Sequence, residues 1–186
     1  SKCFDKIDHA KLLDKLETFP AIRRQVRAWL NAGVIDAGQL YPTDEGTPQG
    51  GVISPLLANI ALHGMEESIK DLVERLPGKG GRSVRRNAVS LIRYADDFVI
   101  IHENRDVINK CRDHISDWLK GMGLELKEAK TTITHTLEGN NPGFDFLGFN
   151  IRQNEVGKYK TGKNSKGELL GFKTIIKPSR KAIQTH

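Results

Sequence analysis

The chain has 186 residues, of which 38% are hydrophobic and 28% are charged, and its net charge is +6. This length can bury one core, and this balance of apolar and charged residues excludes an intrinsically disordered chain. Two cysteines exclude a disulfide framework, and no apolar run approaches a membrane span, so we expect no membrane partner. The excess of basic residues favours polyanionic partners but does not indicate which reaction, if any, the chain catalyses.

The first part of the chain predicts helices. Apolar residues at helical spacing favour helices over 9–19 and 22–32, and a short strand is expected at 39–41. Ser54-Pro55 makes a good helix start, because the hydroxyl can cap free N–H groups and proline suits the first helical position. One helix is predicted from there to about Leu76.

The remainder predicts a hairpin, a helix and further strands. We expect a loop at 77–87, strands at 89–94 and 98–102, and a helix at 105–122. The later strands are expected at 124–126, 131–136, 144–152 and 172–176. This order indicates an α+β fold, in which helices pack on one face of an antiparallel sheet.

Two adjacent carboxylates, Asp96 and Asp97, lie between the strands of the apolar hairpin. Adjacent side chains of a regular strand point to opposite faces, so these two can converge only where the chain turns. Their repulsion would be relieved by divalent cations such as Mg²⁺, which prefers oxygen ligands. Two such ions form the clamp that polymerases use. The alternative is an ordinary turn, in which aspartate bonds nearby backbone N–H groups.

Several ordered motifs resemble those of reverse transcriptases, and most closely those of the bacterial group II intron type. Tyr94-Ala95-Asp96-Asp97 matches the Tyr-x-Asp-Asp box, and Thr47 to Ile60 is similar to the second palm motif. Gly123-Leu124-Glu125-Leu126 with Lys130 resembles the fourth motif. Phe146-Leu147-Gly148-Phe149 resembles the primer-grip hairpin, and Pro178-Ser179-Arg180 resembles the start of the thumb.

The resemblance implies an RNA-directed DNA polymerase with the polymerase palm fold. We expect a palm domain over 1–176 and the start of a thumb over 177–186. The implied cofactor is Mg²⁺, or Mn²⁺ in its place, held by Asp96 and Asp97. The implied partners are an RNA template, a DNA or RNA primer, deoxynucleoside triphosphates and the parent intron RNA, in the bacterial cytoplasm.

The same resemblance implies roles for residues that bind the nucleotide. Phe4 matches the position that closes on the sugar, and Lys2 and Cys3 match positions beside the triphosphate. Gln49 and Gly50 match the contact to the incoming nucleotide or template base. Each has a plainer interpretation: a core phenylalanine, a solvated terminal lysine, or a turn before a helix.

Two further sites follow from the resemblance. Lys130 matches the fourth-motif lysine, a proposed general acid for the departing pyrophosphate, although it could equally be an exposed turn lysine, and Lys127 is its nearby competitor. Phe146, Leu147 and Gly148 match the primer grip, where a glycine lets a primer backbone approach closely. A glycine in a strand can also mark a bulge.

The family's first metal-binding aspartate matches a position upstream of Ser1. We therefore expect the 186-residue piece alone to be inactive, and its parent to be active. The rival interpretation is a non-catalytic RNA-binding or maturase-type protein that assists intron splicing. The basic residues are either solvated or in contact with RNA phosphates; they are Arg82, Arg85, Arg86, Lys158, Lys160, Lys163, Lys166 and Lys173.

Overall fold

The computed structural model describes residues 7–36, 39–41, 53–164 and 166–185. By packing, the chain divides into two compact units, Ser1–Lys127 and Glu128–His186. The predicted palm over 1–176 and thumb start over 177–186 remain predictions.

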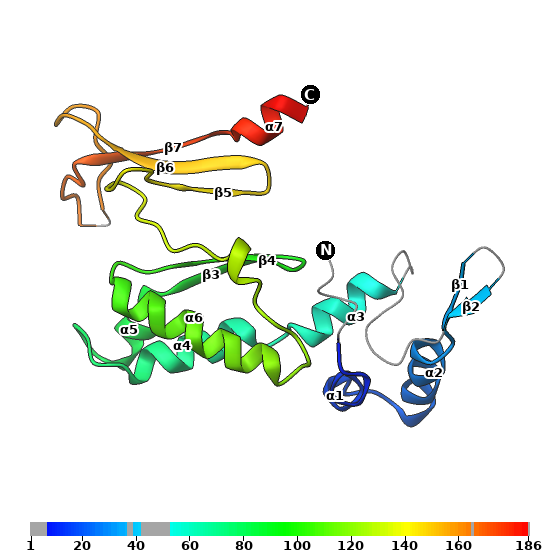
Figure 1. Cartoon of the computed structure of the whole chain (residues 1–186). Helices are drawn as coiled ribbons and strands as arrows, with labels where there is room; N and C mark the ends of the chain where they lie inside the picture. Colours follow the sequence, from blue (N-terminus) through cyan, green and yellow to red (C-terminus); the bar gives the residue numbers. More distant parts are fainter. Residues whose placement is uncertain (1–6, 37–38, 42–52, 165, 186) are drawn as a thin grey trace. The chain divides into compact units, whose positions relative to one another are not determined.

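The first unit contains helices and two antiparallel hairpins (Figure 1). Its elements, in chain order, are α1 (His9–Lys15), α2 (Pro20–Leu30), β1 (Val34–Asp36), β2 (Gln39–Tyr41), α3 (Ser54–Ala61), α4 (Met65–Arg75), α5 (Arg82–Ala88), β3 (Ser90–Tyr94), β4 (Asp97–Ile101) and α6 (Arg105–Lys120). The predicted strand at 39–41, the hairpin strands and the helix after them are confirmed.

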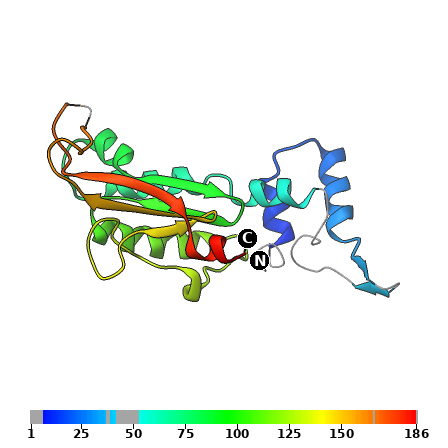
Figure 2. The ribbon, with the colours of Figure 1, turned by 90° about the horizontal axis from the view of Figure 1, so that it is seen from above.

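The β3–β4 hairpin lies on a layer formed by α4 and α6 (Figures 1 and 2). Ile69 of α4 and Cys111 and Ile115 of α6 are buried in the core. Leu91, Phe98 and Ile100 of the hairpin pack against them. The helices therefore cover one face of the hairpin, which agrees with the predicted α+β class.

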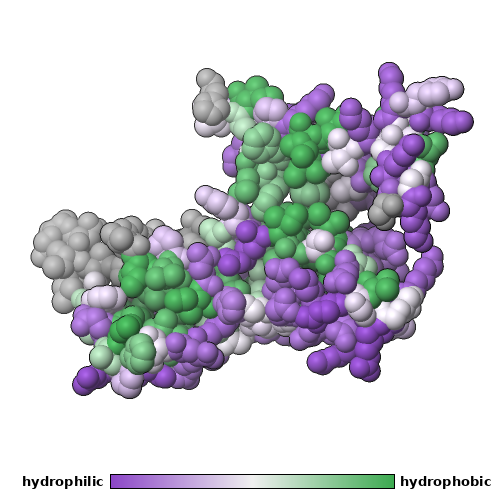
Figure 3. All heavy atoms as spheres, turned by 180° about the vertical axis from the view of Figure 1, so that it is seen from behind, coloured by the Kyte–Doolittle hydropathy of each residue, from purple (hydrophilic) through white to green (hydrophobic). Residues whose placement is uncertain are grey.

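The second unit is a three-stranded antiparallel sheet with a short helix. A 3₁₀ turn, η2 (Glu128–Lys130), precedes β5 (Phe144–Phe146), β6 (Phe149–Glu155), β7 (Phe172–Pro178) and α7 (Arg180–Thr185). The strand order is β5-β6-β7, and the long pair β6–β7 is visible from above in Figure 2. Hydrophobic residues gather on this unit in Figure 3; Phe149 and Ile176 are exposed.

The first helix ends earlier than predicted, and the second begins earlier. The helix predicted over 9–19 ends at Lys15, and the next starts at Pro20 instead of Ile22. Proline disfavours the helical conformation in the residue before it, and Phe19 is extended, with φ −60° and ψ 146°. The junction therefore follows from Pro20. Asp8 caps the first helix by accepting a hydrogen bond from the Lys11 amide at 3.0 Å.

The single helix predicted from Ser54 to Leu76 is wrong. It breaks into α3 and α4 at Gly64, whose φ of +83° is left-handed and is available to glycine at little cost. Ser54 does not cap α3 either: the cap is Ile53, and Ser54 is the first helical residue. Leu56 of α3 is exposed, whereas Leu57 is buried.

Other strand and loop boundaries also differ from the prediction. The loop predicted at 77–87 contains α5, whose arginines bond to α4. Residues 124–126 and 131–136 are not strands. The latter segment makes isolated backbone bonds, such as Gln153 N–H to the Thr136 carbonyl at 2.7 Å, in place of a ladder. The strand predicted at 144–152 is two strands, because the chain reverses at Leu147-Gly148.

Candidate functional site

Asp96 and Asp97 lie at the tip of the β3–β4 hairpin, where the sequence placed them. Tyr94 pairs with Asp97, which leaves Ala95 and Asp96 as the two turn residues. Ala95 has φ +52°, a conformation that costs energy for any residue with a side chain. Strained residues of this kind cluster at functional sites.

The two carboxylates are accessible at this tip. Asp97 is exposed and Asp96 is half-buried. Their oxygens are the donors that hard divalent cations prefer, so the pair can supply part of a metal's ligands. Within the described residues, no group of three or more His, Cys, Asp or Glu side chains could hold a metal. The pair is therefore a partial ligand set among those residues.

Arg93 ties the tip to helix α3. Its Nη1 atom donates to the Ala95 carbonyl at 2.9 Å and to Asn59 Oδ1 at 3.0 Å. Neither Arg93 nor Asn59 is among the site residues predicted from the sequence. No sequence signal pairs them, because they lie 34 positions apart.

The sequence predicts that five residues contact the incoming nucleotide or its template. Lys2, Cys3, Phe4, Gln49 and Gly50 all lie outside the described residues. Their roles remain predictions.

The predicted primer-grip hairpin forms a tight turn in the second unit. Phe146 pairs with Phe149, so Leu147 and Gly148 are the two turn residues, with φ +50° and +81°. Positive φ at both positions is the signature of a type I′ hairpin turn. The Gly148 carbonyl accepts a hydrogen bond from the Ser179 amide at 2.8 Å.

The family follows from comparison with known sequences. The model of the family described as reverse transcriptase (RNA-dependent DNA polymerase) matches residues 1–151. The chain belongs to this reverse transcriptase family. The family match includes the hairpin that carries Asp96 and Asp97, and enzymes of this family generally use divalent metal ions.

The relatives of this reverse transcriptase chain include proteins encoded by introns. The group II intron-encoded protein LtrA of Lactococcus lactis subsp. cremoris is 28% identical over 237 residues, covering 98% of the chain and 39% of that protein. Protein YkfC of Escherichia coli is 35% identical over 182 residues, covering 81% and 45% respectively. The resemblance to the group II intron type is confirmed, and the chain spans less than half the length of these relatives.

Lys130 of this reverse transcriptase chain is exposed and ends the η2 turn in the second unit. The two aspartates belong to the first unit. The general-acid role predicted for Lys130 therefore stays a prediction, as does its competition with Lys127.

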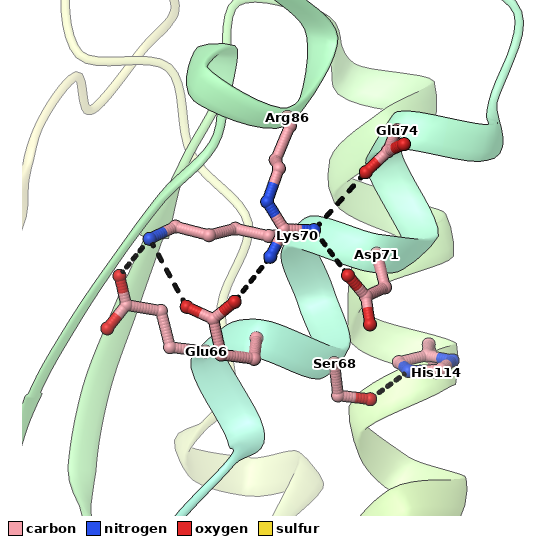
Figure 4. Close-up of polar contacts among 8 residues, drawn as sticks. Glu66, Ser68, Lys70, Asp71, Glu74, Arg86 and His114 are labelled. Carbon is pink, nitrogen blue, oxygen red and sulfur yellow. Dashed lines mark hydrogen bonds and ion pairs between the residues drawn. The ribbon is translucent and has the colours of Figure 1, made fainter. Parts of the chain in front are cut away.

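Two of the basic residues before the β3–β4 hairpin make contacts within the fold. Arg86 of α5 forms ion pairs with Glu67, Asp71 and Glu74 of α4 (Figure 4). Its guanidinium holds the pKa of Asp71 below the usual range. Arg85 donates to the Glu74 carbonyl at 2.9 and 3.1 Å. These two arginines fasten α5 to α4, which limits their availability to RNA.

The second unit carries most of the chain's net positive charge. Residues 128–186 contain ten Lys and Arg against five Asp and Glu, a net charge of +5 out of +6 for the chain. Three exposed cations lie on one face of the β6–β7 pair: Arg152, Lys173 and Lys177. They share this face because Arg152 pairs across the strands with Ile175, which lies midway between the two lysines. Among the residues that the structure describes, no carboxylate forms an ion pair with these three cations.

Among the described residues, no helix is both long and apolar enough to cross a bilayer.

Proposed function

We propose that this chain is the catalytic part of an RNA-directed DNA polymerase of the group II intron type. The observation that carries the proposal is the adjacent pair Asp96-Asp97 at a hairpin tip within a reverse transcriptase family match. The substrates would be deoxynucleoside triphosphates and a DNA or RNA primer on an RNA template, in the bacterial cytoplasm. The parent intron RNA is a further proposed partner.

Asp96 and Asp97 would hold Mg²⁺, or Mn²⁺ in its place, through carboxylate oxygens. A bound divalent ion lowers the cost of negative charge on the attacking and leaving oxygens during phosphoryl transfer. The protein's own part is to fix the two carboxylates at the tip, where a primer 3′-hydroxyl and a nucleotide can approach. Lys130 would supply a proton or a positive charge to the departing pyrophosphate.

Nucleic acid would be held mainly by the second unit. Phosphate contacts provide most of the affinity of proteins for nucleic acid, and the net charge of +5 in residues 128–186 suits such contacts. Phe146, Leu147 and Gly148 would contact the primer, because their tight turn presents backbone and an exposed Leu147 side chain.

A second candidate is a non-catalytic RNA-binding or maturase-type protein that assists intron splicing. The unpaired cations of the second unit favour RNA binding by either kind of protein. The retained Asp96-Asp97 pair favours the polymerase, because RNA binding alone does not need two carboxylates at an exposed tip.

The two candidates are separated by the Asp96→Asn variant of the full-length protein. Primer extension on an RNA template and RNA binding are measured on the same preparations. A polymerase loses extension by at least about a hundredfold, since a metal ligand is gone, and keeps RNA binding. A wild-type protein that binds RNA tightly but never extends a primer would contradict the polymerase proposal.

A further inference from the structure

The Arg93 side chain makes two hydrogen bonds at the hairpin tip that carries the aspartates. Both bonds of Arg93 come from Nη1, which reaches the Ala95 carbonyl at 2.9 Å and Asn59 Oδ1 at 3.0 Å. A guanidinium Nη carries two hydrogens, so one atom can serve both acceptors. Arg93 therefore joins the turn of its own hairpin to a helix from a different motif.

The Ala95 carbonyl belongs to the peptide unit that leads into Asp96. Because the peptide unit is planar, fixing the direction of this carbonyl also fixes the direction of the Asp96 backbone N–H. The commonest two-residue hairpin turns are types I′ and II′, which share a positive φ at the first residue and differ by a flip of this central peptide. Ala95 has the positive φ, whereas Asp96 is not among the residues with positive φ, so the tip has the II′ pattern.

This turn form is not favoured by its own sequence. Type II′ turns prefer glycine at the first central residue, and here it is alanine. A flip to the other form would place Asp96 at positive φ and redirect its side chain. The Arg93 bond opposes that flip, because the flip would turn the Ala95 carbonyl away from the guanidinium.

We propose that Arg93 and Asn59 form a positioning clamp that selects one orientation of the Ala95–Asp96 peptide and thereby aims the two carboxylates. Asn59 holds the guanidinium at α3, so the position of the hairpin tip is fixed relative to this helix. In the sequence, α3 follows the segment that contains Gln49. The expected effect of the clamp on catalysis rests on the proposed polymerase function, whereas its hydrogen bonds do not. Arg93 and Asn59 are positioning residues, since they act through the turn.

Arginine suits this task better than lysine. The guanidinium is planar and stays charged, and its donors are held in a fixed fork. A lysine keeps the charge and can reach one acceptor, but its ammonium does not impose the same geometry. Arg93→Lys should therefore restore part of what Arg93→Gln loses.

The first test is amide hydrogen exchange of the metal-free, full-length protein. Arg93→Gln and Asn59→Leu remove the donor and the helix acceptor, respectively. Each should raise exchange at residues 94–97 by roughly fivefold to tenfold, the effect of losing one hydrogen bond. Arg112→Gln is the matched control, because Arg112 pairs with Asp113 on α6 and should leave exchange at the tip unchanged.

The second test is primer extension by the same proteins. Carboxylates that are aimed wrongly lower stabilisation of the transition state more than binding of the nucleotide. We expect kcat to fall about tenfold or more in Arg93→Gln, with KM for the nucleotide changed by less than about threefold. Arg93→Lys should recover part of kcat, and the double variant should lose little more than either single one, because both act through one contact.

The outcomes separate the clamp from the polymerase proposal. Unchanged exchange at the tip in Arg93→Gln, or in Asn59→Leu, overturns the two-partner clamp, whatever the activity. If both variants loosen the tip but the wild-type protein never extends a primer, the clamp stands and the polymerase proposal fails. Loosened exchange together with a lower kcat supports both.

Discussion

The backbone N–H of Ser179 donates to the Gly148 carbonyl at 2.8 Å, which fixes the start of α7 to the β5–β6 turn. Ser179 is buried, and its hydroxyl oxygen caps α7 by accepting a hydrogen bond from the Ala182 amide at 3.2 Å. The conformation of this turn therefore also sets where the last helix begins.

Stability should respond in opposite directions to changes at the two residues of that turn. Gly148 has φ +81°, so Gly148→Ala should destabilise the chain by about 1–2 kcal/mol, the cost of the left-handed region for a residue with a side chain. Leu147 already bears such a cost at φ +50°. Leu147→Asn should be stabilising by roughly 0.5–1 kcal/mol, because Asn-Gly suits a type I′ turn.

Urea denaturation measures both changes. Gly157→Ala is the control, since Gly157 does not have a positive φ and an added Cβ meets no atom within 4 Å. A Gly148→Ala variant as stable as the wild type would contradict the turn as described.

Salt dependence should reveal the contribution of the unpaired cations on β6 and β7. Lys173 and Lys177 lie about 13 Å apart along their strand at the usual rise per residue, with Arg152 beside the midpoint. Replacing all three with glutamine should reduce the slope of log K against log salt by about 2–3 for RNA, if each cation neutralises one phosphate. Fluorescence anisotropy at several salt concentrations measures this slope.

A triple variant of the β6–β7 loop, with Lys158, Lys160 and Lys166 changed to glutamine, removes the same charge at positions off the strands. The prediction for the strand cations is contradicted if the loop variant lowers the slope as much as the strand variant does. It is also contradicted if neither variant changes the slope.

Cys111 should be unreactive in the folded chain. It is fully buried in α6, and burial raises the pKa of its thiol from 9.0 to about 11. Because the thiolate is the nucleophile, iodoacetamide at pH 8 should modify Cys111 only after unfolding. A Cys3→Ser background leaves Cys111 as the single thiol, and rapid modification in buffer without denaturant would contradict the burial.

The same burial predicts a dependence of stability on pH. The folded-state pKa lies above the unfolded value, so the contribution is fully present below pH 9 and is lost as the pH rises through about 11. The free energy of unfolding should therefore fall more steeply between pH 9 and 11 in the wild type than in Cys111→Ala. Urea midpoints at pH 8, 9 and 10 compare the two proteins, and parallel curves would contradict the assignment.

Part of this architecture follows from local sequence rules. Apolar runs on either side of Asp96-Asp97 predict the hairpin and its tip. Apolar residues at helical spacing predict α6, which Asn104 caps in the structure. These features depend on neighbours in the chain. The reverse transcriptase resemblance shares one of these stretches, the hairpin tip with Tyr94-Ala95-Asp96-Asp97.

The remaining features do not follow from the local sequence pattern. Gly64 looks like a tolerable glycine within a helical pattern, and only its left-handed backbone breaks the helix. The segment at 77–87 has a composition typical of loops, yet Arg85 and Arg86 find partners on α4 and form α5. The bond between Arg93 and Asn59 is of the same kind, because no local pattern joins them.

The most direct test of the account is a crystal structure of the full-length protein with primer, RNA template, deoxynucleoside triphosphate and Mn²⁺. Anomalous scattering locates Mn²⁺ without reference to the protein. We predict an anomalous peak bonded to carboxylate oxygens of Asp96 and Asp97 and to the nucleotide phosphates. A bound nucleotide whose Mn²⁺ lies away from both aspartates would contradict the central claim.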